Sequence, residues 1–269
     1  MLYCRNVTDE VLFGGIEHAG RVVRSGPHVL RPSNRYTESI HQVLKSLRSH
    51  GFHGASNPVG VDADGRERLV YIEGDVPLPP YPDWAQTDDL LVSITALMRG
   101  LHDASEDLAL SRLQWNVELA DPHGGPVLCH NDVCLENVVF RDGRAVALLD
   151  FDFAAPGRRA FDLATFARLC VPIDDPKSAA RLGWSIDDAP GRLRLVADAY
   201  GVDAGARGGM LEALDWSMKH GGEFVRRRVE TGKPGYTQMW EAMGGAERYD
   251  RRRRWWERNR DRFVTRLVD

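Results

Sequence analysis

The feature that most constrains the fold is an Asp142-Gly143 pair between two β-prone runs. Such a pair favours a tight β-hairpin, because both residues accept the backbone conformation of a two-residue turn. Counting back from this turn predicts that Asn137 faces Leu148, so that Asn137 and Asp150 leave the hairpin at the same end. Asp132 lies on the segment that leads into the first strand. The sequence therefore brings two carboxylates and one amide oxygen together without any long-range assumption.

This convergence suits phosphoryl transfer. Mg²⁺ takes oxygen ligands, usually one or two from the protein together with phosphate oxygens and water. Asn137 and Asp150 are the candidate Mg²⁺ ligands, and Asp132 is the candidate catalytic base that accepts the proton of the attacking hydroxyl. A surface hairpin with an acidic rim is the plainer alternative. Zinc is a weaker one, because the cysteines and the histidine within Cys129–Cys134 match no paired-cysteine pattern.

The chain reads as two parts that differ in periodicity. The first part places β-prone runs around one helix, which is stopped near Gly51. A proline-rich connector at Pro77–Pro82 follows, and it predicts an N-terminal unit of residues 1–74 and a C-terminal unit of residues 75–269. The predicted strands and helix of the first unit are Val11–Phe13, Arg21–Arg24, His28–Leu30, Thr37–His50, Val59–Asp62 and Arg68–Ile72.

The second unit is mainly helical apart from Val127–Phe153, which reads as strands and loops. Its apolar residues recur at helical spacing over most of the remaining length. Together the two units predict an α+β fold class. The predicted helices are Asp88–His102, Phe161–Leu169, Arg192–Tyr200, Gly208–Glu230 and Ala246–Leu267.

Composition and charge limit the classes of partner and the cellular location that we expect. The net charge of −4 gives no reason to expect nucleic acid, and no run approaches the roughly 20 apolar residues of a membrane span. The polar stretch Met1–Glu10 is not a signal peptide, so we expect a cytoplasmic protein whose four cysteines are free thiols. The C-terminal tail is basic and the rest of the chain acidic. We expect the run Arg251–Arg254 to be a solvated helix face rather than a nucleic-acid or membrane patch.

The spacing His-x-Asp-x-x-x-x-Asn, followed by Asp after a hairpin, is typical of a kinase catalytic loop and its metal-binding residues. Here it reads His130-Asn131-Asp132, then Asn137, then Asp150-Phe151-Asp152, with Phe161-Asp162-Leu163-Ala164 downstream. These segments resemble the aminoglycoside phosphotransferase and choline kinase superfamily, in which the loop usually reads His-Gly-Asp. The resemblance implies a two-lobed protein-kinase-like fold, with a small N-terminal antiparallel sheet plus one helix and a larger helical C-terminal lobe. It also implies Mg²⁺ and ATP or GTP as co-substrate.

The resemblance assigns roles to individual residues as well. Asp132 is the catalytic base, with Asn137 and Asp150 as metal ligands. His130 and Asp162 hold the catalytic loop by hydrogen bonds. Asp152 is either a ligand of a second metal ion or a structural residue. The connector Tyr71–Gly74 is the hinge whose backbone contacts the nucleotide base, which makes Glu73 and Gly74 nucleotide-binding residues.

One departure from the kinase pattern stands out. A kinase fold places a Lys on the third strand and pairs it with a Glu on the following helix. Here the third strand leads to Arg31, and the register puts His41 where the Glu belongs. We expect Arg31 to bind the nucleotide phosphates, because its guanidinium fits phosphate oxygens. Gly14-Gly15 and Gly20 form either a loop that covers the phosphates or a plain hairpin.

These inferences favour an O-phosphotransferase that acts on a hydroxylated small molecule: an antibiotic, an amino sugar, an amino alcohol or a related metabolite. The alternative is a catalytically inactive kinase-fold protein that binds nucleotide and serves in immunity or regulation. The acidic pairs Asp174-Asp175 and Asp187-Asp188 would favour a cationic substrate if they line the cleft. The competing interpretation, which the sequence favours, is that they are helix caps and solvated loops.

Overall fold

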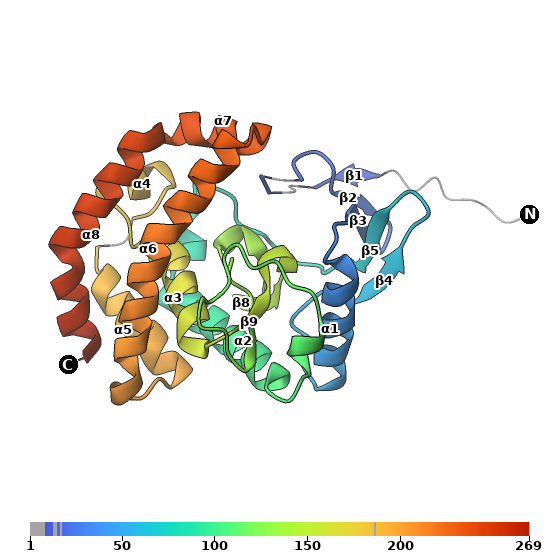
Figure 1. The fold of residues 1–269 in the computed structure, drawn as a ribbon, viewed down its shortest axis with the longest axis horizontal. Helices are drawn as coiled ribbons and strands as arrows, with labels where there is room; N and C mark the ends of the chain where they lie inside the picture. The colour runs from blue at the N-terminus through green and yellow to red at the C-terminus, as the bar shows by residue number, and fades with distance from the viewer. Residues whose placement is uncertain (1–8, 13–14, 17, 186, 269) are drawn as a thin grey trace, which may run out of the picture.

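The computed structural model describes residues 9–12, 15–16, 18–185 and 187–268. Figure 1 shows the N-terminal sheet and one helix at one end of the molecule and the long C-terminal helices at the other. Two short β-hairpin-like pairs lie between them. A single apolar core runs through the helical part and reaches the N-terminal helix.

The N-terminal sheet is antiparallel, with the strand order β1-β2-β3-β5-β4. The prediction of three strands, one helix and two strands is confirmed in type and order. The predicted strand Arg68–Ile72 is misplaced, because the observed strand begins two residues earlier and ends at Val70. Phe13 and Gly14 lie outside the described residues. The bounds are β1 Glu10–Val11, β2 Val23–Ser25, β3 His28–Pro32, β4 Pro58–Val61 and β5 Arg66–Val70.

Helix α1 (Thr37–Ser49) packs beside this sheet (Figure 1). Its apolar residues recur at a spacing of three or four, so that one face is buried and the other exposed. The helix ends where expected, since Gly51 takes a left-handed φ of +86°. The buried apolar residues are Ile40, Val43, Leu44 and Leu47.

The helical part is built on five long helices. All five were predicted from the sequence to within three residues at either end. Two shorter helices were not predicted: α4 (Pro176–Arg181) and α7 (Pro234–Met243). The long helices are α2 Asp88–Ser105, α3 Arg159–Cys170, α5 Ala189–Tyr200, α6 Arg207–Glu230 and α8 Gly245–Val268. Among the described residues, no helix combines the length and the apolar character that crossing a membrane requires.

The predicted hairpin is β7 (Val138–Arg141) and β8 (Arg144–Leu148), joined by a turn at Asp142-Gly143. The pairing of Asn137 with Leu148 is wrong by one residue. A bulge between Val139 and Phe140 shifts the register, so that Val138 faces Leu148. Asn137 and Asp150 still leave the hairpin at the same end, because the Leu149 amide donates to the Asn137 carbonyl at 2.8 Å.

A second short pair, β6 (Val127–Cys129) with β9 (Ala155–Gly157), flanks this hairpin along the chain. The connector from the N-terminal sheet is tied to the hairpin as well. Asp75 and Phe140 exchange two backbone hydrogen bonds of 2.8 Å. The hairpin therefore touches the segment that leaves the sheet, and residues from both parts of the chain can meet at its open end.

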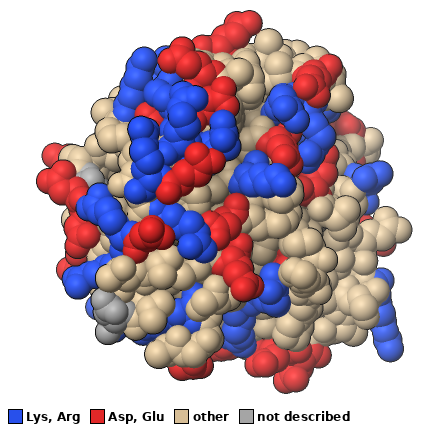
Figure 2. Space-filling view, turned by 60° about the vertical axis from the view of Figure 1, so that its left-hand side comes forward, with Lys and Arg blue, Asp and Glu red and all other residues tan. Residues whose placement is uncertain are grey.

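The basic run Arg251–Arg254 on α8 differs in part from the expectation. Figure 2 shows Lys and Arg interspersed with Asp and Glu on the face that includes the C-terminal helices. Arg253 fits this pattern, because it pairs with Asp250 and Glu257 on the same helix. Arg252, in contrast, is buried. The run is therefore solvated at Arg253 and Arg254, whereas Arg252 is buried and Arg251 is half-buried against Asp175.

Candidate active site

A cavity of about 1160 Å³ is lined by residues of the N-terminal sheet, the β7–β8 hairpin and the C-terminal helices. It brings together five of the six predicted site residues: Arg31, Gly74, Asp132, Asn137 and Asp150.

Glu73 is the predicted residue that the structure does not bring to this cavity. Its side chain is exposed and lies 3.5 Å from Arg24. Its carbonyl accepts a hydrogen bond of 3.1 Å from Nε of Arg141. Gly74 does line the cavity, at a φ of +150°, where a Cβ would lie 2.5 Å from the Phe140 carbonyl oxygen. Only glycine fits this close approach.

Asp132 and Asn137 are held together by the loop between β6 and β7. The Asn137 side-chain amide donates to the Asp132 carbonyl at 2.9 Å and to its carboxylate at 3.3 Å. The Asn137 amide oxygen makes no hydrogen bond with any described residue, so it is available to a metal ion. Burial, with the negative charge of Asp150, raises the pKa of Asp132 to about 8. A carboxyl with a raised pKa suits a residue that accepts a proton.

Asp150 follows β8 with a left-handed φ of +60°. Its carboxylate is about one-third exposed, and Asp152 beside it lines the same cavity. The donor set of Asn137, Asp150 and Asp152 consists of oxygen atoms only. Hard, oxygen-rich donor sets of this kind fit Mg²⁺.

Arg31 points into the cavity and contacts three carboxylates. Its Nε lies 2.6 Å from Glu67, Nη1 lies 2.9 Å from Asp150 and Nη2 lies 2.7 Å from Asp152. Burial alone would lower the pKa of Arg31, but the charges of Asp152, Asp150 and Glu67 outweigh it and raise that pKa. Arg31 is therefore a fixed cation at the candidate metal site.

Glu67 is the residue that sequence reasoning missed. It faces Arg31 directly across the β3–β5 pair, and its side chain is 1% exposed. His41 of α1 donates to its second oxygen at 2.7 Å. The Glu that pairs with the basic residue of the third strand thus comes from the neighbouring strand, while the helix contributes His41. Placing the start of β5 at Arg66 would have found it, because the register then pairs Arg31 with Glu67.

Both carboxylate oxygens of Asp152 have a partner. His18, between β1 and β2, lies 3.3 Å from one oxygen, and Arg31 holds the other. Burial would raise the pKa of Asp152, but the charges and hydrogen bonds of Arg31 and His18 outweigh it and lower that pKa to about 2. Gly15 and Ile16 of the same loop also line the cavity. The loop between β1 and β2 therefore reaches the candidate metal site.

The candidate catalytic loop around Asn131 has a backbone conformation that its sequence explains. Asn131, immediately before Asp132, has a φ of +65°. Asn tolerates the left-handed region better than other residues that have a side chain. Its side-chain amide also donates to the Phe153 carbonyl at 2.9 Å. His130 Nε2 donates to the Leu149 carbonyl at 2.8 Å, which fixes the loop to the end of β8.

Asp162, at the start of α3, binds the backbone of the same loop. Its two oxygens accept the backbone N–H groups of His130 and Asn131, each at 2.8 Å. His102 of α2 donates to it at 3.0 Å. These hydrogen bonds outweigh the effect of burial and lower the pKa of Asp162. The carboxylate therefore fixes two consecutive amides, immediately before Asp132.

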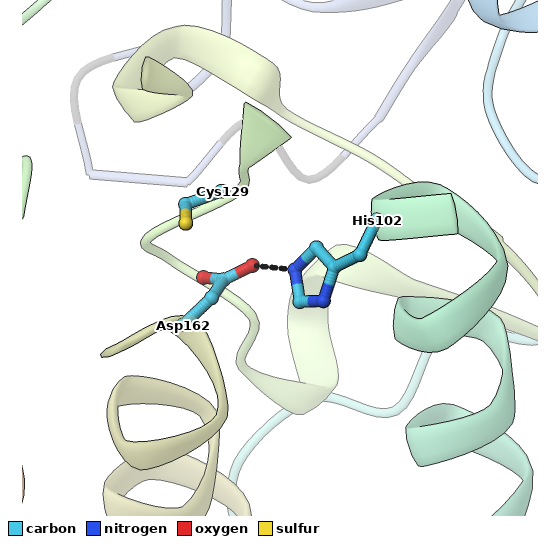
Figure 3. A group of neighbouring side chains, drawn as sticks. All are labelled: His102, Cys129 and Asp162. Carbon is cyan, nitrogen blue, oxygen red and sulfur yellow. Dashed lines mark hydrogen bonds and ion pairs between the residues drawn. The ribbon is translucent and has the colours of Figure 1, made fainter. Parts of the chain in front are cut away.

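Figure 3 shows His102, Cys129 and Asp162, a buried group whose ligand atoms lie within 4.8 Å of one another. Such a group could hold a metal ion, but its atoms are already engaged. Both Asp162 oxygens accept backbone N–H groups, and the Tyr200 hydroxyl lies 2.8 Å from His102 Nδ1. Burial raises the pKa of Cys129, which disfavours the thiolate that a metal requires. The group is therefore part of the scaffold of the candidate catalytic loop.

The chain is similar to known proteins over most of its length. A family model described as the phosphotransferase enzyme family matches residues 17–196. The trifolitoxin immunity protein of Rhizobium leguminosarum bv. trifolii is 30% identical over 218 residues, which cover 77% of this chain and 80% of that protein.

Solved structures of two kinases are similar to this chain in fold. Amicoumacin kinase in complex with AMP-PNP, Ca²⁺ and Ami has a TM-score of 0.62 at 12% identity, covering 87% of this chain and 86% of that one. A choline/ethanolamine kinase family protein from Mesorhizobium loti has a TM-score of 0.61 at 16% identity, covering 98% and 94%. These likenesses confirm the predicted α+β, protein-kinase-like fold class.

Proposed function

Because the chain belongs to the phosphotransferase enzyme family, we propose that it transfers the γ-phosphate of ATP or GTP to a hydroxyl group of a small molecule. The convergence of Asp132, Asn137 and Asp150 on one cavity supports this most directly. In this proposal, residues 1–74 hold the nucleotide and residues 75–269 carry the catalytic and acceptor-binding residues. The reaction takes place in the cytoplasm, and an antibiotic acceptor would make the protein a resistance enzyme.

Each residue has a distinct task in the proposed reaction. Asn137 and Asp150 hold Mg²⁺, which neutralises charge on the phosphate oxygens when it is bound. Asp132 accepts the proton of the acceptor hydroxyl, and Asn137 fixes its carboxylate through the 3.3 Å hydrogen bond. Arg31, whose guanidinium lies beside Asp150, would bind phosphate oxygens. Positioning and charge thus supply most of the catalysis, as is general for phosphoryl transfer.

The alternative is an inactive nucleotide-binding protein that acts in immunity. Two observations keep it in view. The relative that is 30% identical is named as an immunity protein. Arg31 also holds Asp150, the proposed metal ligand, at 2.9 Å.

Nucleotide consumption separates the two functions. We expect Mg²⁺-dependent release of ADP or GDP when wild-type protein meets a hydroxylated acceptor from a broad panel. Asp132→Asn should bind Mg·AMP-PNP nearly as well as wild type, yet lose about a hundredfold or more in kcat, the range for removal of a general base. Asp150→Asn should weaken Mg·AMP-PNP binding as well.

The matched control is Asp142→Asn, which removes the same charge from the exposed turn of the same hairpin. It should behave as wild type in both assays. Binding of Mg·AMP-PNP without turnover of any acceptor would favour the inactive alternative. Turnover that survives Asp132→Asn would contradict the assignment of the base.

A further inference from the structure

Three arginines of the C-terminal helices line the cavity and have no role in the proposed chemistry. Arg168 comes from α3, and Arg248 and Arg252 come from α8. The two α8 residues are four positions apart, so they share one face of the helix. Both are buried, at 8% and 6% exposure.

The two arginines of α8 share a single carboxylate. Asp174 lies 3.0 Å from Nη2 of Arg248 and 3.6 Å from Nε of Arg252. Asp175, its neighbour, is used elsewhere, because it caps α4 at Ser178 and pairs with Arg251. Asp132 is a second carboxylate close enough to act on Arg168, so three guanidinium groups face two carboxylates and this wall of the cavity is left positive.

These four residues therefore do not form the acidic wall that was the less favoured of the two interpretations. Asp174 lines the cavity, but two arginines neutralise it. Asp188 caps α5 through the Gly191 amide and does not line the cavity, and neither do Asp175 and Asp187. The interpretation of these residues as caps and solvated loops fits three of the four.

The hydrogen bonding of Arg252 and Arg168 is incomplete, whereas Arg248 donates to Ser178 and Asp174. Nε of Arg252 is buried without a hydrogen-bond partner among the described residues, and its Nη2 reaches only the sulfur of Met218 at 3.6 Å. Arg168 donates from Nε to Ser217 at 2.8 Å, while its terminal nitrogens contact no acceptor in the described part of the chain. Burial of unpaired polar groups is costly, so such atoms usually bind a partner, either within the protein or from a ligand.

The electrostatics agree with this geometry. Burial, together with the charges of Arg252 and Arg248, lowers the pKa of Arg168 to about 9. Arg168 is also close enough to Asp132 for its charge to act on the pKa of that carboxyl. An anion at the cluster would relieve the crowding of like charges and would lie next to the proposed catalytic base.

We infer that the phosphate acceptor is itself an anion: a hydroxylated small molecule whose carboxylate or phosphate group binds between Arg168 and Arg252 while its hydroxyl lies at Asp132. This inference rests on the proposed function and narrows its substrate class. Guanidinium groups recognise both carboxylate and phosphate oxygens through paired hydrogen bonds. Polycationic amino sugars are disfavoured at this wall, because they would meet the three arginines.

The binding test uses simple anions as probes. Inorganic phosphate and acetate are titrated by calorimetry into wild-type protein in saturating Mg·AMP-PNP at constant ionic strength. We expect at least one of them to bind, and to bind at least tenfold more weakly to Arg252→Gln and Arg168→Gln. The matched control is Arg254→Gln, which removes the same charge from the exposed side of α8 and should bind the probe as wild type does. Arg168→Gln provides the answer if buried Arg252→Gln does not fold.

The turnover test uses matched acceptor pairs: hydroxy acids against their amides, and sugar phosphates against the free sugars. We expect the anionic member of at least one type of pair to have at least a tenfold higher kcat/KM, and the type that responds tells carboxylate from phosphate. The inference is overturned if neither probe binds, if binding is unaffected by both arginine variants, or if neutral or cationic acceptors react as well as anionic ones. Failure of the proposed function gives a different result: wild-type protein would then consume no nucleotide, whichever acceptor is supplied and whatever its charge.

Discussion

Replacing Arg31 with Ala should weaken the binding of Mg·nucleotide by about 1.5–3 kcal/mol, the scale of one charge-assisted hydrogen bond. The structure shows which nitrogens of Arg31 would contribute this free energy. Glu67 occupies Nε of Arg31, so Nη1 and Nη2, which now contact Asp150 and Asp152, are the atoms that would bind phosphate in the proposed function. The loss corresponds to a roughly tenfold to hundredfold rise in Kd.

Glu67→Gln should act on nucleotide only through Arg31. The variant keeps the size of the side chain and an acceptor for Nε, but the 2.6 Å ion pair becomes a neutral hydrogen bond. A difference of about 1 kcal/mol separates these two kinds of bond, so Kd should rise roughly fivefold. When Arg31 is already Ala, Glu67→Gln should produce no further loss.

Calorimetry with Mg·AMP-PNP on wild type, the two single variants and the double variant measures this coupling. The control is Arg68→Ala, which removes an arginine from the same strand as Glu67 but one that pairs with Asp62 outside the cavity. Its Kd should match wild type. If Arg31→Ala does not fold, Arg31→Lys replaces it and should show part of the loss, because a point charge substitutes for a fork. Wild-type affinity in the Arg31 variant, or losses that simply add in the double variant, would refute the reasoning.

Two further predictions concern the scaffold of the catalytic loop. Asp162→Asn should lower the free energy of unfolding at pH 7 by about 1–3 kcal/mol, since a buried backbone N–H loses its acceptor. The folded-state pKa of Asp162 lies below its ordinary value, so the carboxylate stabilises the fold above about pH 4 and this stabilisation is lost as the pH falls toward the folded-state pKa. Denaturant titrations at several pH values should therefore show a weaker acid sensitivity in the variant, and equal sensitivity would count against the assignment. Asn131→Ala should be about 1–2 kcal/mol less stable than Asn131→Gly, because only Gly accepts the left-handed φ without strain; equal melting temperatures for this pair would contradict it.

The parts of the site that were predictable depend on local chemistry. The Asp142-Gly143 turn fixes the hairpin, and the hairpin places Asn137 and Asp150 at one end whatever the rest of the chain does. The bulge at Val139 was not predictable, because one extra residue in a strand leaves no clear pattern in the side chains.

Glu67 was missed for a related reason. The charged sequence Arg66-Glu67-Arg68 has low β-propensity, so the strand was placed two residues too late. The partner of Arg31 then fell outside the predicted strand. Strand boundaries are determined by pairing with neighbouring strands as well as by local preference, and this pairing is not visible in one segment alone.

The arginine cluster depends on the packing of α3, α6 and α8, which no local rule predicts. One signal was present in the sequence nevertheless. Arg248 and Arg252 share a helical stripe with Trp256, Phe263 and Leu267, all of which are buried. Charged residues on the apolar stripe of a helix indicate a buried polar site, because burial of an unpaired charge is costly. The net charge of the tail alone does not reveal this stripe.

The position of Glu67 on β5 has a consequence for control of the site. In protein kinases the ion pair joins a strand to a helix, so that movement of the helix makes or breaks it. Here Arg31 and Glu67 face each other within one sheet, and the hydrogen bonds of the β3–β5 pair fix their separation. Helix α1 contributes only His41, which contacts the other oxygen of Glu67, so a shift of α1 leaves the Arg31–Glu67 pair in place. The short segment from Asp152 to Asp162 contains β9, which is paired with β6, and leaves little room for an activation loop. The two elements that switch protein kinases thus have counterparts here that are held within β-sheet pairs, and under the proposed function we expect occupancy of the cavity by nucleotide and acceptor to determine activity.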